Sequence, residues 1–133
     1  SSYAGNCDIE VDGITWNVTG NSTMNPWRIG GKSLEAVDRE VYTKTAFSNA
    51  LTSVDVTFGT ANSITVNSCK LLYSTNADFS DASEVSVDFA AESTVSFVAD
   101  FPANAYYKLV LNVTVSDSKN KFVQLSKIEF LGK

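Results

Sequence analysis

The sequence predicts an all-β protein, an antiparallel β-sandwich, from three observations. Apolar and polar residues alternate with period two in most hydrophobic segments, turn residues separate these segments at short intervals, and only one segment has a helical pattern. Alternation of this kind is typical of half-buried strands, because successive side chains of a strand point to opposite faces of the sheet. Many short strands at this spacing indicate a sandwich or a barrel.

The clearest alternation is in the last two predicted strands, 106–116 and 121–132, which a polar turn at 117–120 joins. In the first of them, every second residue from Tyr107 to Val115 is apolar, and the residues between are mostly polar. This pattern predicts a strand with one face in the core.

The apolar phase changes inside the second of these strands. It runs through Val123 and Leu125 and then jumps to Ile128 and Phe130. Because side chains alternate strictly along a strand, both pairs can face the core only if one extra residue is inserted between them. The sequence therefore predicts a β-bulge near 126–127.

Shorter segments upstream follow the same rule, and Gly, Asn, Asp, Ser and Pro residues separate them, as expected for turns. One segment, 64–74, changes phase in its middle, and a further short strand is expected at 93–98. The alternating apolar sets are Ile14, Trp16 and Val18; Val54, Val56 and Phe58; Ile64 and Val66, followed by Cys69, Leu71 and Tyr73; and Val85, Val87 and Phe89.

A helix competes with a strand only at 33–41. Leu34, Val37 and Val41 have helical spacing there. Against a helix, the run is short, and the overlapping segment 39–45 has the β-branched and aromatic content of a strand. We therefore expect a turn followed by a strand.

Composition limits the class of protein. A chain of 133 residues is expected to form a single domain over 1–133, with 1–12 as the end of a linker and the first strand. No apolar run approaches the ~18 residues that span a membrane. The net charge of −5 argues against a nucleic-acid partner, because phosphates favour a concentrated basic face. The start of the chain lacks the charged and apolar regions of a signal peptide, so we expect an excised domain or a mature product.

The chain has no histidine, and this excludes Ser-His and Cys-His nucleophiles as well as the common zinc sites. Two carboxylates could still hydrolyse a glycoside, but no motif pairs candidates such as Glu35 and Asp38. We therefore expect no enzyme. The two cysteines, Cys7 and Cys69, either pair as a disulfide or stay free, with Cys69 packed as a small apolar group.

The most distinctive local motif is the segment 25–32, NPWRIGGK. In a functional interpretation, Trp27 is a flat platform for a sugar ring, and Arg28, Asn25 and Lys32 donate hydrogen bonds to its hydroxyls. In the alternative, Trp27 and Ile29 belong to the core and Arg28 pairs with an acidic neighbour. Trp16 is expected in the core because it shares the phase of its apolar neighbours.

Three tyrosines fit either the core or a ligand-binding surface, since a tyrosine can bury its ring and keep its hydroxyl in water. They are Tyr42, Tyr73 and Tyr106, and Tyr42 joins the candidate ligand-binding residues. A surface rich in Ser, Thr and Asn suits neutral, hydroxylated ligands, although such residues also simply populate the exposed faces of strands.

Four segments in order, SVDVTFG at 53–59, KLLYSTNADF at 70–79, AYYKLVL at 105–111 and SKIEFLG at 126–132, resemble the galactose-binding-like jelly-roll family. That family includes discoidin-type domains and many carbohydrate-binding modules. The resemblance covers residues from about 50 to 132 and implies a sandwich of eight to ten antiparallel strands. Many members hold a structural calcium ion, for which Asp12 and Glu129 are the candidate ligands here; no other cofactor is expected.

The segments 16–20 and 27–32 also resemble small accessory domains of secreted bacterial surface proteins. Together these likenesses imply a non-catalytic accessory module of a secreted or cell-surface protein, attached to a larger parent protein or a catalytic domain, that binds a glycan. The alternative is a structural spacer or a protein-interaction domain without a small ligand.

Overall fold

The computed structural model describes residues 5–11, 14–24, 27–30, 35–115 and 121–132, with the side chains of 14–17, 28–30, 35–115 and 121–132. These residues form only strands, turns and irregular segments, so among them no helix is long and apolar enough to cross a membrane. The strands are β1 (Gly5–Val11), β2 (Ile14–Met24), β3 (Trp27–Ile29), β4 (Val37–Thr43), β5 (Leu51–Asn62), β6 (Ile64–Ser74), β7 (Ser83–Val87), β8 (Thr94–Phe101), β9 (Tyr106–Val115) and β10 (Phe122–Gly132).

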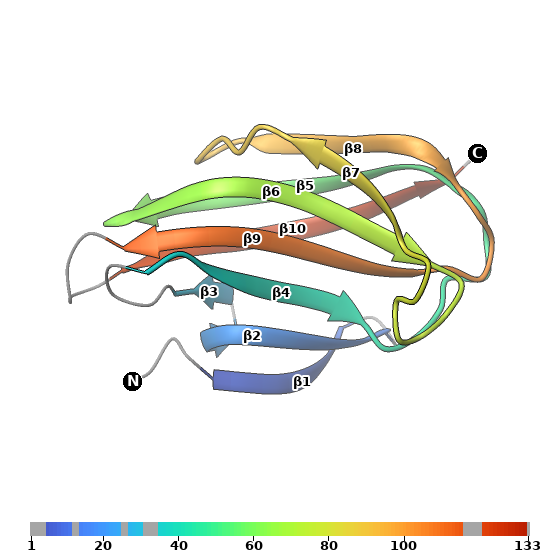
Figure 1. The fold of residues 1–133 in the computed structure, drawn as a ribbon, viewed down its shortest axis with the longest axis horizontal. Coiled ribbons are helices and arrows are strands. Elements are labelled where there is room, and N and C mark those ends of the chain that lie inside the picture. Colours follow the sequence, from blue (N-terminus) through green and yellow to red (C-terminus); the bar gives the residue numbers. More distant parts are fainter. Residues whose placement is uncertain (1–4, 12–13, 25–26, 31–34, 116–120, 133) are drawn as a thin grey trace.

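The strands form two packed antiparallel layers (Figure 1). Hydrogen-bonded neighbours follow the order β7-β6-β9-β4-β2-β3-β10-β5-β8, with β1 paired to β2. The front layer contains β7, β6, β9 and β4, and the rear layer contains β3, β10, β5 and β8. Strand β2 links the layers, because it pairs with β4 near Trp16 and with β3 near its end at Met24. The all-β antiparallel prediction is thus confirmed.

The core lies between the layers and is built from the alternate residues that the sequence pattern predicts. Strand β9 contributes five alternate side chains that are at most 2% exposed, those of Tyr107, Leu109, Leu111, Val113 and Val115. Each strand of both layers also turns apolar side chains inward, so the burial of apolar area stabilises both sheets together. The facing residues include Val41, Val54, Val56, Phe58, Cys69, Leu71, Val95, Phe97, Val123 and Leu125.

The predicted bulge in the last strand is present. The register of β10 against β5 shifts between Leu125, which lies opposite Phe58, and Lys127, which lies opposite Thr57. Beyond the shift, Ile128 and Phe130 pack against the core. Strand β6 has a similar shift between Val66 and Ser68 against β9, at the phase change that the sequence shows.

The segment with competing helical and strand patterns forms a strand. Strand β4 pairs with β9 from Val37 to Tyr42, and Val41 and Thr43 are buried. The turn expected before it falls largely on 31–34, outside the described residues. Pairing on both sides, with β2 and with β9, stabilises the strand over the short helix that local spacing allows.

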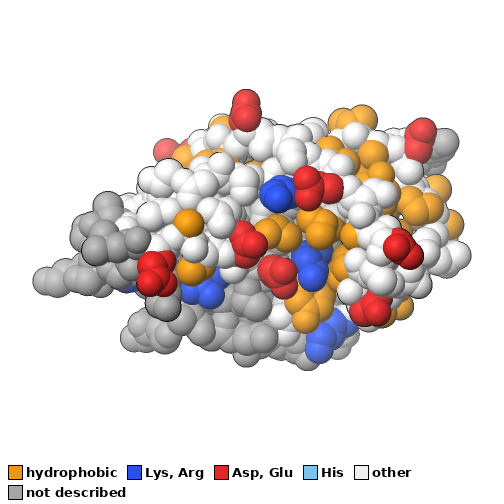
Figure 2. Space-filling model, in the orientation of Figure 1, with side chains coloured by type: hydrophobic (Ala, Val, Ile, Leu, Met, Phe, Trp, Pro, Cys, Tyr) orange, Lys and Arg blue, Asp and Glu red, His pale blue; other side chains and the backbone are white. Residues whose placement is uncertain are grey.

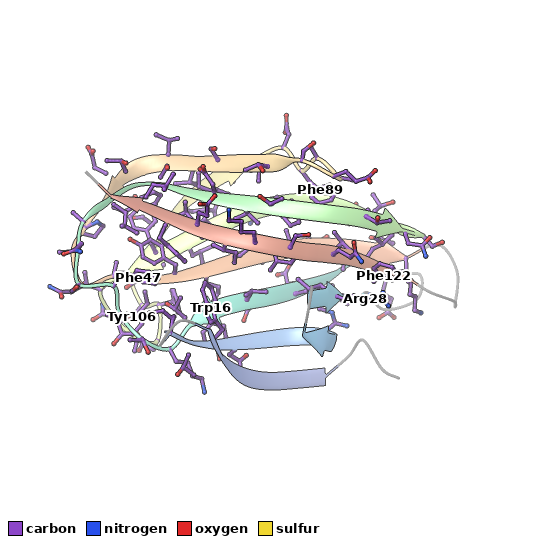
Figure 3. All side chains as sticks on the ribbon, turned by 180° about the vertical axis from the view of Figure 1, so that it is seen from behind. Trp16, Arg28, Phe47, Phe89, Tyr106 and Phe122 are labelled. Carbon is purple, nitrogen blue, oxygen red and sulfur yellow. The ribbon has the colours of Figure 1, made fainter. Side chains whose placement is uncertain are left out.

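Aromatic rings close one end of the sandwich (Figure 3). The ring of Phe130 lies 4.1 Å from that of Phe47, 5.4 Å from that of Tyr107 and 5.7 Å from that of Trp16, between centroids. Trp16 is 6% exposed, so its predicted place in the core is confirmed. The Tyr107 hydroxyl is buried and has no hydrogen-bond partner within the described part of the chain.

Cys69 is a free thiol in the core, 1% exposed, so the disulfide between Cys7 and Cys69 is not formed and the second alternative holds for Cys69. Burial raises the pKa of the Cys69 thiol from 9.0 to about 12, because the thiolate is poorly solvated there.

We expect Cys69 to resist alkylation in the folded protein, since the thiolate is the reactive form. In a Cys7→Ser variant at pH 8, iodoacetamide should label Cys69 only after urea unfolds the chain, as read by intact mass. Rapid labelling of the folded variant would contradict the burial of this thiol.

Candidate ligand-binding face

The predicted site residues divide between described and undescribed parts of the chain. Asn25, Lys32 and Asp12 lie outside the described residues. Trp27 belongs to strand β3, but its side chain is also outside them. The structure therefore bears on three of the candidates, which are Arg28, Tyr42 and Glu129.

Tyr42 lies on the outer face of the front layer. Its neighbours Val41 and Thr43 are buried, so the alternation of the strand turns Tyr42 away from the core. Directly opposite Tyr42 on β9 is Lys108, and opposite Lys108 on β6 is Leu72. The three side chains thus form a row across the outer surface of three adjacent strands.

Two further aromatic side chains join Tyr42 there, and we call Tyr42, Phe79 and Tyr106 the aromatic face. The ring centroid of Phe79 lies 6.0 Å from that of Tyr42 and 6.5 Å from that of Tyr106, both in edge-on arrangements. All three residues are partly exposed. Figure 2 shows hydrophobic side chains beside basic and acidic ones on this side of the molecule.

Lys108 covers part of the aromatic face. Its Nζ atom lies 4.6 Å from the ring centroid of Phe79 and 5.1 Å from that of Tyr42, which are distances of cation–π contacts. The same atom lies 3.6 Å from Oε1 of Glu40. Beside this pair, Lys70 and Glu84 approach within 3.7 Å. Two ion pairs, Lys108 with Glu40 and Lys70 with Glu84, therefore lie on this surface.

A hydrogen-bonded loop holds Phe79 in place between β6 and β7. The Phe79 amide donates to the Asn76 carbonyl at 3.0 Å, and the Ser74 hydroxyl donates to the Ser80 carbonyl at 2.8 Å. The Ser80 amide donates to Asp78, and this hydrogen bond holds the pKa of the Asp78 carboxyl below its usual value. Phe79 itself has φ 59, a left-handed conformation that bulky residues rarely adopt.

Arg28 is remote from the aromatic face. Figure 3 shows it with Phe122 at one end of the sandwich and Tyr106 at the other. The Arg28 guanidinium carbon lies 4.6 Å from the centroid of the Phe122 ring. Ile29 is fully buried, as the core interpretation of this segment predicts. The same interpretation predicts an acidic partner for Arg28, and none is found among the described residues. The structure thus separates Arg28 from Tyr42.

Glu129, a predicted calcium ligand, lies exposed on β10, with its Oε1 atom 3.2 Å from Nζ of Lys127. Within the described residues, no three His, Cys, Asp or Glu side chains are grouped to hold a metal ion. Since Asp12 lies outside these residues, the calcium site stays a prediction.

Two residues of this surface were not among the sequence-based candidates. Lys108 falls in the polar phase of its strand, which indicates exposure but no contact with an aromatic ring. Phe79 is an apolar residue among the turn residues of 76–81, and an aromatic side chain inside a polar turn is the one signal that could have singled it out.

Comparison of the chain with models of protein families, with curated proteins and with solved structures finds no match.

Proposed function

We propose that this chain is a non-catalytic module that binds carbohydrate on the aromatic face. The observation that carries the proposal is the contact of three partly exposed rings, Tyr42, Phe79 and Tyr106, from three separate segments of the chain. Sugar rings have apolar C–H faces, so clustered aromatic side chains offer them a matching surface.

The charges of the face favour a neutral ligand. Lys108 is matched by Glu40, and Lys70 by Glu84. A charged ligand would have to compete with these pairs, whereas sugar hydroxyls can accept from the ammonium groups and donate to the carboxylates without breaking them. Neutral, hydroxylated glycans are therefore the class that this surface fits best.

The strained loop supports a role in binding. A left-handed conformation costs an ordinary residue about 1–2 kcal/mol. Because Phe79 is only partly buried, the packing of its ring stabilises the fold too little to account for this cost by itself. Strained residues of this kind concentrate at functional sites. The loop places the Phe79 ring between Tyr42 and Tyr106, which makes the rings contiguous.

We also propose that the sandwich is a jelly roll of the galactose-binding-like type, in an accessory module of a secreted or cell-surface protein with a larger parent chain. In support of the jelly roll, the chain passes from the front layer to the rear and back at β4, β5 and β6, and again at β7, β8 and β9. Calcium at Asp12 and Glu129 belongs to the same proposal.

The test uses Phe79→Asn, because Asn adopts the left-handed conformation readily and so removes the ring without new backbone strain. On a glycan array and in a titration with the best glycan, we expect wild-type binding and an affinity at least about tenfold weaker for the variant, since truncated aromatic contacts at binding sites cost more than ~1 kcal/mol. The free energy of unfolding should change by no more than about 1 kcal/mol.

Val98→Ala is the matched control, because Val98 is an apolar residue of the rear layer that is 68% exposed. It should bind the glycan like the wild type. If no glycan binds the wild type, or if Phe79→Asn binds as well as Val98→Ala, the aromatic face is not a sugar-binding site.

A second candidate function, a protein-interaction module, is favoured by a different observation. Val98 and Leu131 are exposed, at 68% and 41%, and both lie opposite Ser53 on the outer surface of the rear layer. Exposed apolar side chains in one row are typical of protein contacts. If the glycan array shows no binding, the protein-interaction module is the remaining candidate function.

A further inference from the structure

Two strands along one side of the sandwich are paired on one side only. In the order of hydrogen-bonded neighbours, β7 stands at one end and β8 at the other, and no described strand pairs with the outer edge of either. Figure 1 shows both strands along the same side of the molecule. Since every second residue of an edge strand turns its N–H and C=O groups away from its partner, such an edge can pair with a further strand.

Strand β8 offers a regular stretch for such pairing at 94–98. Its register against β5 is continuous there and shifts only beyond Val98. The stretch has the sequence TVSFV, with no charge and with none of the lysine, proline or bulge by which proteins usually protect an open edge. Val98 at its end is 68% exposed on the outer surface, where an apolar side chain of an added strand would cover it.

The charges around these two edges are all of one sign. The segment 71–107, which contains β7 and β8, has six Asp or Glu residues and no Lys or Arg. Figure 2 shows acidic side chains along the upper rim of the molecule, where β8 runs in Figure 1. Glu92 and Asp100 flank the stretch 94–98 at its two ends. Four of the six are exposed and form no ion pair with another described residue, and they are Asp81, Asp88, Glu92 and Asp100.

We propose that the open edge of β8 at 94–98 binds an extended, basic segment of a partner protein by strand addition. Backbone hydrogen bonds provide the pairing, and Lys or Arg side chains near the ends of the segment reach Glu92 and Asp100. A segment that reaches from one to the other spans about 25 Å of extended chain, since a strand rises about 3.3 Å per residue. This proposal rests on the second candidate function, protein interaction, and does not depend on the aromatic face.

Charge favours a basic partner over a second copy of this chain. Two copies that pair antiparallel through β8, centred on Ser96, bring Asp100 of each opposite Glu92 of the other, and like charges directly opposite destabilise a pair of strands. The net charge of −5 adds a repulsion between copies in any register. A basic segment is attracted by the same charges.

The test follows ¹H–¹⁵N NMR spectra of the full chain during titration with three capped peptides. The probe is Lys-Thr-Val-Thr-Thr-Thr-Thr-Thr-Lys, which in antiparallel pairing places its lysines opposite Asp100 and Glu92 and its valine opposite Val98. We expect saturable shifts of the amide signals of 94–98. In the second peptide glutamate replaces both lysines, and it should bind at least about tenfold more weakly, because like charges then face each other. In the third the threonine amides are N-methylated, and it should not bind, since it lacks these backbone donors.

Two variants of the chain complete the test. Asp100→Lys should bind the lysine peptide at least about tenfold more weakly than the wild type, and the glutamate peptide more tightly. Asp38→Lys makes the same charge change at an exposed site on β4 in the front layer. At physiological salt, which screens distant charges, it should leave both affinities unchanged.

The proposal is overturned if the lysine peptide shifts no signal of 94–98, if the glutamate or the N-methylated peptide binds as tightly, or if Asp100→Lys and Asp38→Lys lose affinity alike. Dilution of the chain without peptide should leave the signals of 94–98 in place. A shift on dilution would make a second copy the occupant of this edge and would also overturn the proposal. A failed peptide titration does not bear on glycan binding, which is tested on the aromatic face.

Discussion

Deletion of Ser126 is expected to abolish the cooperative folding of this protein. Ser126 lies where the register of β10 shifts between Leu125 and Lys127. Without the extra residue, strict alternation would turn Ile128 and Phe130 to the outer surface if Val123 and Leu125 stay in the core. The effect should be read from urea unfolding, followed by tryptophan fluorescence and circular dichroism.

The size of the effect follows from the contacts of Phe130. Its ring touches the rings of Phe47, Tyr107 and Trp16, so its loss from the core should cost about 3–5 kcal/mol, with a further cost for Ile128. The total stability of a domain is typically about 5–15 kcal/mol. The deletion therefore removes most of the free energy of unfolding that keeps the chain folded.

Ser126→Ala and Lys127→Ala are the controls, because both residues are exposed and neither substitution changes the number of residues in the strand. Each should alter the free energy of unfolding by no more than about 0.5 kcal/mol. A deletion variant that unfolds cooperatively within about 1 kcal/mol of the wild type would show that this bulge does not fix the register of β10.

The bulge was predictable from sequence because a change of phase is a local property. Four apolar residues of one strand cannot all face one side unless a residue is inserted between them, whatever the rest of the fold. The strand Val37–Thr43 was harder, since helical spacing and β propensity conflict there. Its content of β-branched and aromatic residues favoured the strand, and pairing with both neighbours agrees with it.

The candidate sites were less predictable, because they depend on contacts between distant segments. Tyr42 was a candidate, but its position opposite Lys108 follows from the pairing of β4 with β9, and the position of Phe79 follows from one left-handed residue in a turn. Arg28 was expected either to donate hydrogen bonds to a sugar or to pair with an acidic neighbour. No local pattern indicates that its ring partner is Phe122, which follows it by more than ninety residues.

Replacement of Tyr107 by Phe is expected to stabilise the protein. The Tyr107 ring is 1% exposed and packs on Phe47 and Phe101, but its hydroxyl is buried without a partner among the described residues. An unsatisfied buried hydroxyl costs about 1–3 kcal/mol, and Phe removes it while it keeps the ring. Urea unfolding at pH 8 should therefore show a gain on the order of 1 kcal/mol, with Tyr107→Ala as the opposite control, at a loss of about 3–5 kcal/mol.

The advantage of Phe should grow at alkaline pH. Burial, with a smaller contribution from Tyr73, raises the pKa of Tyr107 from 10.0 to about 12. Between these values the unfolded chain loses the phenolic proton and the folded chain keeps it, so the stability of the wild type falls as pH rises. At pH 11 this loss amounts to about 1.4 kcal/mol, and Tyr107→Phe lacks it. The buried Cys69 thiol destabilises both proteins alike from pH 9.0 upward and cancels in the comparison. A difference between variant and wild type that stays constant from pH 8 to pH 11 would mean that the Tyr107 hydroxyl ionises equally in the folded and unfolded chains.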